Sequence, residues 1–267
     1  MVKNWMYSLF VTALLGMAVG ASAQESAVSL YNDGLEKLKA KDYAASLPLF
    51  EKAIATADTS ETDTKVVRLS QRNGSIAAYY VGTDLRKEKK LDDALRTFEE
   101  GIAYDSAFYA NYIGRAQVLD DQDRDALAVK AYFMAAKASE KAKKLDKVED
   151  LINKAANIPA VNWGKKNWDK AIASAQAFLE EKESADVHYY LAQALAEKKD
   201  YDNAIEHGKK AAELATGDDK NKSYFGLGDI YEAAGQKDNA IAAYKKVGGS
   251  KYAERAKYKA NQLAGGK

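Results

Sequence analysis

One pattern of residues returns several times along this chain, and it constrains the fold more than any other feature. Near the C-terminus, Leu191, Ala192 and Leu195 are followed by Tyr201 and Ala204. About 36 residues later a similar pattern returns, and a fixed period of this length predicts a solenoid of stacked units. The second copy consists of Tyr224, Leu227, Gly228, Tyr231, Ala240 and Tyr244. Because solenoids present extended surfaces to partners, the pattern favours a binding protein over an enzyme.

Each copy of the pattern predicts two antiparallel helices. On the first helix, Leu191 and Leu195 fall on one face, since spacings of three and four share a helical stripe. Residues 198–200 break the apolar period and predict a short turn before the second helix. Small residues at Ala192 and Ala204 allow the two backbones to approach closely. A bulky side chain at either position would overpack the contact, at a cost of roughly 1–3 kcal/mol.

These residues resemble the tetratricopeptide repeat (TPR) motif, which has small residues at its eighth and twentieth positions and an aromatic residue at its twenty-fourth. The resemblance implies an all-α fold, a right-handed superhelical solenoid of antiparallel helix pairs. We expect about six units and a C-terminal capping helix. The eighth position is filled by Gly34, Gly82, Gly114, Ala192 and Gly228, and the twentieth by Ser46, Ala94, Ala128, Ala171, Ala204 and Ala240.

The expected units have unequal regularity. Residues 59–73 form a polar stretch before the second unit and predict an extended helix there. The third unit requires about two extra residues before Ala128, and the fourth unit is the weakest. A loop over residues 157–166 is expected to interrupt the fourth unit, either as a harmless insertion or as a docking place. The expected units are roughly 27–60, 75–105, 107–140, 143–183, 185–218 and 221–248, followed by a cap helix over 250–263.

The N-terminus has the form of an export signal. Lys3 precedes an apolar run over residues 5–20, and Ala21-Ser22-Ala23 then supplies a cleavage site between small residues. We therefore expect residues 1–23 to be a cleaved signal peptide and residues 24–267 to be the TPR solenoid, with an uncleaved anchor as the alternative. The protein is then exported, to the periplasm if the source is Gram-negative and otherwise secreted. No later stretch is apolar enough to predict a membrane span.

Composition argues against several classes of activity. The chain has no cysteine, which excludes disulfides, thiol catalysis and a lipid-modified cysteine. Its 40 basic and 39 acidic residues are interleaved, so no basic block predicts nucleic acid as a partner. The only two histidines, His188 and His207, have a spacing that fits no short metal motif. We expect no catalytic residue, no metal and no cofactor, and both histidines to be structural or exposed.

The resemblance also implies where a partner would bind. In TPR arrays the first helices line a concave groove, and the fifth and ninth motif positions point into it. Recognition surfaces are often rich in aromatic residues with a polar group. The alternative is that these rings pack against neighbouring helices. The expected groove residues are Tyr31, Tyr79, Asn111, Arg115, Tyr189, Gln193, Phe225 and Asp229.

The sequence therefore predicts a non-enzymatic protein-binding scaffold of the cell envelope that holds a partner segment in its groove. A clamp for C-terminal carboxylates is not expected, because Tyr31 and Leu35 stand where that clamp has lysine and asparagine. Two alternatives stay open. Exposed tyrosines and Trp163 would stack on sugar rings in a carbohydrate or cell-wall binding module, and a self-assembling structural protein would use the groove or the cap for a second copy.

Overall fold

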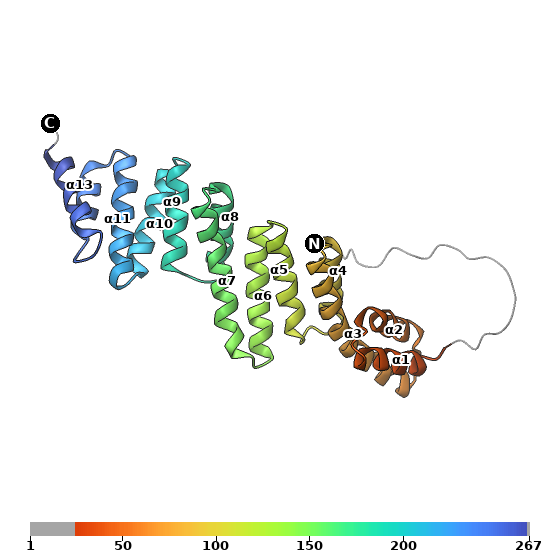
Figure 1. The fold of residues 1–267 in the computed structure, drawn as a ribbon. Coiled ribbons are helices and arrows are strands. Elements are labelled where there is room, and N and C mark those ends of the chain that lie inside the picture. Colours follow the sequence, from red (N-terminus) through yellow and green to blue (C-terminus); the bar gives the residue numbers. More distant parts are fainter. Residues whose placement is uncertain (1–24, 266–267) are drawn as a thin grey trace, which may run out of the picture.

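The computed structural model describes residues 25–265, which fold into thirteen helices and no strand (Figure 1). The predicted signal segment, residues 1–23, lies outside the described residues. In chain order the helices are α1 (Ala27–Lys39), α2 (Tyr43–Thr56), α3 (Glu61–Lys87), α4 (Leu91–Tyr104), α5 (Tyr109–Asp121), α6 (Asp125–Lys141), α7 (Leu145–Gly164), α8 (Trp168–Leu179), α9 (Ala185–Glu197), α10 (Tyr201–Leu214), α11 (Gly217–Ala233), α12 (Lys237–Lys245) and α13 (Ala253–Gly265).

The first twelve helices form six antiparallel pairs, and α13 closes the C-terminal end (Figure 1). Each helix packs mainly against its neighbours in the chain, as in a solenoid. The predicted all-α array of six units and a cap is thus confirmed. The predicted extended helix before the second unit is also present, because α3 runs for 27 residues and begins at the capping residue Ser60.

The two helices of every pair are joined by the same tight turn. One residue in each turn has a left-handed backbone, with φ between 56° and 73°. The next amide then bonds back into the first helix, as Asp42 N does to the Lys37 carbonyl at 2.9 Å. The turn residues are Lys41, Lys89, Asp123, Lys166, Lys199 and Gly235.

These turns fix the register of each unit, and they correct the expectation for the third. The small residue of the motif stands seven positions before the turn residue in the regular units, as Gly82 does before Lys89. In the third unit, the position seven residues before Asp123 is Ala116 and not Gly114. Ala116 is fully buried. The unit therefore contains no two-residue insertion before Ala128, and the expected register of its first helix was wrong by two residues.

The expected loop over residues 157–166 was also wrong. Helix α7 continues from Leu145 to Gly164 with Pro159 inside it. A proline within a helix removes one backbone hydrogen bond, at a cost of about 3 kcal/mol or more. Packing offsets this cost, since Ile158 and Pro159 are buried and Asn162 donates a hydrogen bond of 3.2 Å to Asp125 of α6.

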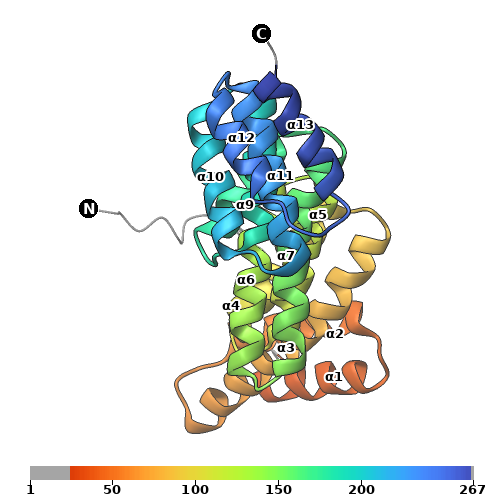
Figure 2. The same cartoon turned by 90° about the vertical axis from the view of Figure 1, so that its left-hand side faces the viewer.

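The first helices of the pairs form the inner layer of the array. Successive first helices pack on one another, as α1 does on α3, α3 on α5, α7 on α9 and α9 on α11. A layer whose members are closer together lies on the inside of a bend, so the first helices line the concave face. Figure 2 shows that α1 and α2 run across the direction of α6 and α7, so the array also twists along its length.

The bend changes sense between the third and fourth units. There the second helices meet, because α6 packs directly on α8. Within residues 25–265, α5 and α7 are not among the pairs of helices that pack closely. The concave face is therefore divided into two stretches, one formed by α1, α3 and α5 and the other by α7, α9 and α11.

Close approach between helices depends on glycine at a few positions. The ring of Phe98 on α4 lies between Gly82 of α3 and Gly114 of α5. A Cβ atom at Gly82 would lie only 2.9 Å from Phe98 Cε1, and one at Gly114 would collide with the same ring. Phe98 is itself 1% exposed and has no free space into which it can move.

We predict that Gly114→Ala destabilises the protein by about 1–3 kcal/mol, because the added methyl group overpacks Phe98. Gly164→Ala is the matched control, since no atom lies within 4 Å of its Cβ position. Alanine there should be neutral or stabilising by up to about 1 kcal/mol, from helix propensity. Urea unfolding of the two variants measures the difference, and equal effects would contradict this account of the packing.

Candidate functional site

An aromatic cluster lies on the second concave stretch. Trp163 ends α7, Tyr189 and Tyr190 stand on α9, and Lys222 lies on α11. The ring centroid of Trp163 is 5.4 Å from that of Tyr190 and 6.3 Å from that of Tyr189. The Lys222 ammonium lies 4.4 Å from the Tyr189 centroid and 5.2 Å from the Tyr190 centroid. All four side chains are partly exposed, and we call them the Trp163 cluster.

The electrostatics of the Trp163 cluster keep Tyr189 neutral and Lys222 in place. Burial raises the pKa of Tyr189 to about 12, so its hydroxyl stays protonated at neutral pH. Lys222 is held by the two ring faces and by Asp186, whose carboxylate lies 3.5 Å from its ammonium. A cation over aromatic rings contributes about 0.5–2 kcal/mol. The cluster is thus ordered before any partner arrives.

The expected groove residues of α11 serve the cap more than the open groove. Phe225 is 6% exposed and stacks on Tyr252, with 5.6 Å between ring centroids, while Arg255 lies 5.1 Å above its ring. Asp229 accepts a hydrogen bond of 2.7 Å from Lys259 of α13 and lies 2.7 Å from the Tyr244 hydroxyl. These contacts tie α11 to α12 and α13.

Gln193, expected at the ninth position of its unit, is partly exposed and faces α11. Its side-chain amide nitrogen would lie 2.8 Å from a Cβ atom at Gly226. Of the eight expected groove residues, only Tyr189 belongs to the Trp163 cluster, and Gln193 stands one helical turn further along the same helix. The binding roles of both residues stay predictions.

The first concave stretch carries tyrosines that pack on neighbouring rings. Tyr31 lies 6.0 Å from Phe50 and accepts a long hydrogen bond of 3.4 Å from Asn73. Tyr79 meets the ring of Phe108 edge-on at 6.0 Å. Both tyrosines are partly exposed, and their binding roles also stay predictions.

The middle of the first stretch is bridged by charge. Arg86 of α3 pairs with Asp121 of α5, with 2.7 Å between Nε and Oδ2, and donates a further hydrogen bond of 3.0 Å to Gln117. The guanidinium approaches both oxygens of Asp121, which is the geometry that gives arginine pairs their strength. This bridge ties α3 to α5.

Asn111 and Arg115 do not lie where the sequence placed them. Asn111 is fully buried and donates hydrogen bonds of 3.0 Å and 2.9 Å to the carbonyl and hydroxyl of Ser75 on α3. Arg115 pairs with Glu99 of α4 at 3.2 Å. The physical reason is the two-residue register error, because the true fifth and ninth positions of this unit are Ile113 and Gln117.

Sequence reasoning missed Tyr190 and Lys222 as members of a cluster, and it placed Trp163 in a loop. A continuous α7 puts Trp163 one turn beyond Pro159 on the helix that faces α9. The proline concealed this placement, since it suggested that the helix had already ended. Lys222 stands three residues before Phe225, a spacing that keeps both on one face of α11.

The two histidines meet across the α9–α10 pair. Their Nδ1 atoms lie 2.9 Å apart, and His188 Nε2 lies 2.7 Å from a carboxylate oxygen of Glu183. One of the two Nδ1 atoms must be without a proton to accept the hydrogen bond. His188 is buried and His207 is partly exposed, and a structural role for both stays a prediction. Within residues 25–265, no group of three or more histidine or acidic side chains is arranged to hold a metal.

We predict that acidification below about pH 6.5 destabilises the protein in part through His207. Burial, followed by the nearby His188, lowers the pKa of His207 below its ordinary value. The unfolded chain then takes up this proton at a higher pH than the folded chain. Stability is therefore complete above the unfolded pKa and is lost as pH falls through the folded pKa.

The measurement is urea unfolding at about pH 7.5 and about pH 5.5 for wild type and His207→Gln. The variant should lose less stability on acidification than wild type. Burial raises the pKa of Glu51 and of Glu100, but this contribution is common to both proteins and cancels in the comparison. Equal losses in the two proteins would contradict the contribution assigned to His207.

We predict that Asn111→Ala destabilises the protein by about 1–3 kcal/mol without changing any binding activity, because Asn111 joins α5 to α3 inside the core. Asn153→Ala on the exposed face of α7 is the control and should change stability by less than about 0.5 kcal/mol. Thermal unfolding monitored by circular dichroism compares them. If the Asn111→Ala variant kept its stability but lost partner binding, this assignment would be wrong and Asn111 would be a groove residue.

Comparisons with known proteins agree with this architecture. Residues 183–247 match the family model of the tetratricopeptide repeat, a segment that spans α9 to α12. None of the helices in residues 25–265 has the length and apolar content that a membrane span needs. A comparison with curated proteins finds no match.

Solved structures of TPR proteins are similar at low identity. They include a thermophilic TPR protein, TTC0263, of Thermus thermophilus (14% identity, 90% of this chain and 99% of that one, TM-score 0.32). They also include the C-terminal part of a TPR protein of Cytophaga hutchinsonii (19% identity, 87% and 85%, TM-score 0.39). YrrB, a TPR protein described as having an unusual peptide-binding site, is another (19% identity, 69% and 92%, TM-score 0.33). Residues 183–247 are thus similar to the tetratricopeptide repeat, and the other helix pairs share the antiparallel arrangement of this segment.

Proposed function

We propose that this protein is a non-enzymatic scaffold that binds a segment of a partner protein on its second concave stretch. The observation that carries the proposal is the Trp163 cluster, which gathers three partly exposed aromatic rings and a cation from α7, α9 and α11. Tryptophan and tyrosine dominate the binding energy of protein interfaces, because they bury a large apolar area and keep a polar group for a hydrogen bond.

The form of the surface suits an extended or helical peptide segment. The tyrosine hydroxyls supply hydrogen bonds to a peptide backbone, and the ring faces supply apolar contact. Each side chain of the Trp163 cluster already has neighbours that fix its position, so less rotamer entropy is lost on binding. We expect apolar side chains of the segment to contact Trp163 and Tyr190, whose rings are partly exposed.

We further propose that the scaffold acts in the cell envelope after export. This part rests on the basic start, apolar run and small-residue site within residues 1–23. Fractionation of the source cells, with N-terminal sequencing of the mature protein, tests it. Export with cleavage after Ala23 supports the proposal, and an uncleaved protein in the cytoplasm contradicts it.

We predict that Trp163→Ala with Tyr190→Ala weakens partner capture by at least about tenfold, since two aromatic anchors are removed. The matched control is Tyr258→Ala, which removes an aromatic ring that is 63% exposed on α13 and lies outside the cluster. An envelope extract is passed over wild type and both variants, after circular dichroism has shown equal helicity. Capture that survives in the double variant would contradict the proposed site.

A photo-crosslinking amino acid at position 190 or 258 then identifies the contact. The partner should crosslink from position 190 and not from position 258.

The Trp163 cluster also suits a sugar ring, since indole and phenol faces stack on sugars. A rise in melting temperature with soluble cell-wall glycans, absent in the double variant, would favour carbohydrate binding. Light scattering at two concentrations separates both functions from self-assembly.

A further inference from the structure

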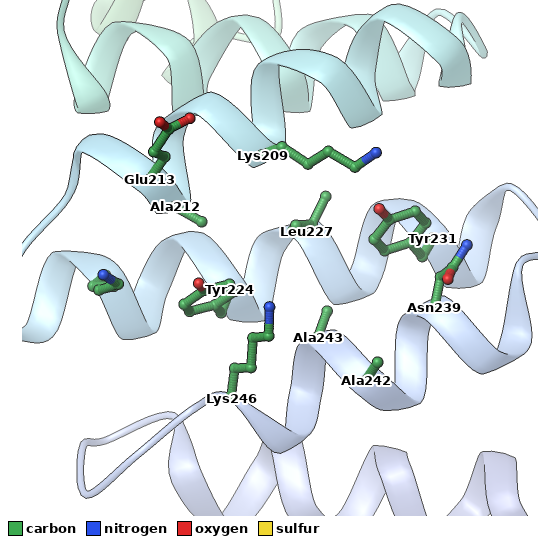
Figure 3. A pocket seen from close by; sticks show the side chains of 11 residues that line it. Lys209, Ala212, Glu213, Tyr224, Leu227, Tyr231, Asn239, Ala242, Ala243 and Lys246 are labelled. Atoms are coloured by element: carbon green, nitrogen blue, oxygen red, sulfur yellow. The ribbon is translucent and has the colours of Figure 1, made fainter.

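A second surface lies on the opposite side of α11 from the Trp163 cluster. A pocket of about 520 Å³ opens between α10 and α12, with α11 as its floor (Figure 3). The floor consists of Tyr224, Leu227 and Tyr231, and Ala212 and Ala243 form the walls. Spacings of three and four place the floor residues on one face of the helix, while Lys222, Phe225 and Asp229 lie on the other. The pocket is therefore separate from the concave groove.

The pocket exists because the sixth unit is built with a shorter and smaller second helix. Helix α12 has 9 residues, whereas α10 has 14, so α12 covers less of α11, and only the segment after α12 reaches its first turns, where Gly248 N donates a hydrogen bond of 2.8 Å to Asn221. A smaller side chain at one position of the second helix also opens the pocket. In the fifth unit His207, three residues after Ala204, fills the space against His188. In the sixth unit the corresponding residue is Ala243, three residues after Ala240, and its small side chain leaves open the space beside Tyr224.

The rim of the pocket is basic. Lys209, Lys220 and Lys246 line it, and Glu213 is the only acidic residue that does. In the part of the chain that the structure describes, these three lysines form no ion pair with an acidic side chain. The Lys246 ammonium lies 5.1 Å from the Tyr224 ring centroid, at the edge of the floor. By contrast, Lys222 on the other side of α11 borders aromatic rings and is also paired with an acidic side chain.

An apolar floor whose rim carries three unpaired lysines and one glutamate favours an anionic ligand with an apolar group. A volume of this size falls within the range of pockets that hold small ligands or one large side chain with its flanking backbone. Unpaired lysines gain most from anionic groups placed at the rim, where water still screens part of the interaction. The hydroxyls of Tyr224 and Tyr231 supply hydrogen bonds at the floor.

We propose that this pocket binds an acidic peptide segment of a partner protein, and that one aromatic or large aliphatic side chain of the segment enters it. The apolar side chain packs on Leu227 between Tyr224 and Tyr231. The flanking carboxylates of the segment lie against Lys209 and Lys246 on the two sides of the opening. The scaffold then has two faces for partners, one on each side of α11.

The test uses three labelled peptides with blocked ends and the full protein without residues 1–23. In the first peptide a single phenylalanine is flanked by aspartate and glutamate, in the second alanine replaces the phenylalanine, and in the third lysine and arginine replace the acids. Fluorescence anisotropy at low salt should detect binding of the first peptide. The second should bind at least about tenfold more weakly, and the third should not bind.

Two pocket variants locate the site. Ala242→Trp fills the opening from an exposed position on α12, and it should weaken binding of the first peptide by at least about tenfold. Lys209→Glu with Lys246→Glu should weaken it by a similar factor and reduce its salt dependence. Lys245→Glu is the matched control, because this exposed lysine on the same helix does not line the pocket. It should leave the affinity within about twofold.

Several results would overturn the proposal. They are failure of the first peptide to bind, equal binding of the acidic and basic peptides, and equal affinity in wild type and both pocket variants. A concentration-dependent dimer that Ala242→Trp abolishes, without peptide binding, would assign the pocket to a second copy instead. The Trp163→Ala, Tyr190→Ala variant should bind the first peptide normally, which separates this site from the groove. Melting curves of every variant exclude loss of fold as the cause.

Discussion

The close approach of two helix backbones is the contact on which this solenoid depends. In three of the six units a glycine on the first helix receives an aromatic ring from the second, as Gly34 does with Phe50 and Gly228 with Tyr244. Rings that enter such spaces are almost completely buried, and they hold the helix pair at a fixed separation and angle. The separation of the two helices within these units, and hence the relative position of their surface residues, follows from this contact.

The sequence predicted the parts of the fold that this contact controls. Small and aromatic residues at regular intervals indicated the number of units, the order of the helices and the cap. The prediction failed where one residue type suggested the wrong local structure. Gly114 resembled the small residue of the motif, but it accommodates Phe98 of the preceding unit, and Ala116 fills the motif position. Pro159 resembled the end of a helix that in fact continues, because buried contacts offset its missing hydrogen bond.

The candidate site was harder to predict than the fold for the same reason. Groove positions are counted from the turn between the two helices of a unit. An error of two residues therefore selected the face of α5 that carries the buried Asn111 instead of the face that carries the partly exposed Gln117. The Trp163 cluster depends on contacts between three helices, and a period along the sequence cannot show which rings meet. The period also does not show that the short α12 leaves part of one face of α11 open. Both the Trp163 cluster and the pocket on α11 depend on how far neighbouring helices overlap.

The direct contact between α6 and α8 has a mechanical consequence. Elsewhere the array bends toward its first helices, and at this one junction it bends the other way. A chain with bends of opposite sense lengthens under tension as a serpentine spring does, by straightening both bends while each helix pair stays intact. Extension of such an array would be taken up at the contacts between units, including the contact of α6 with α8.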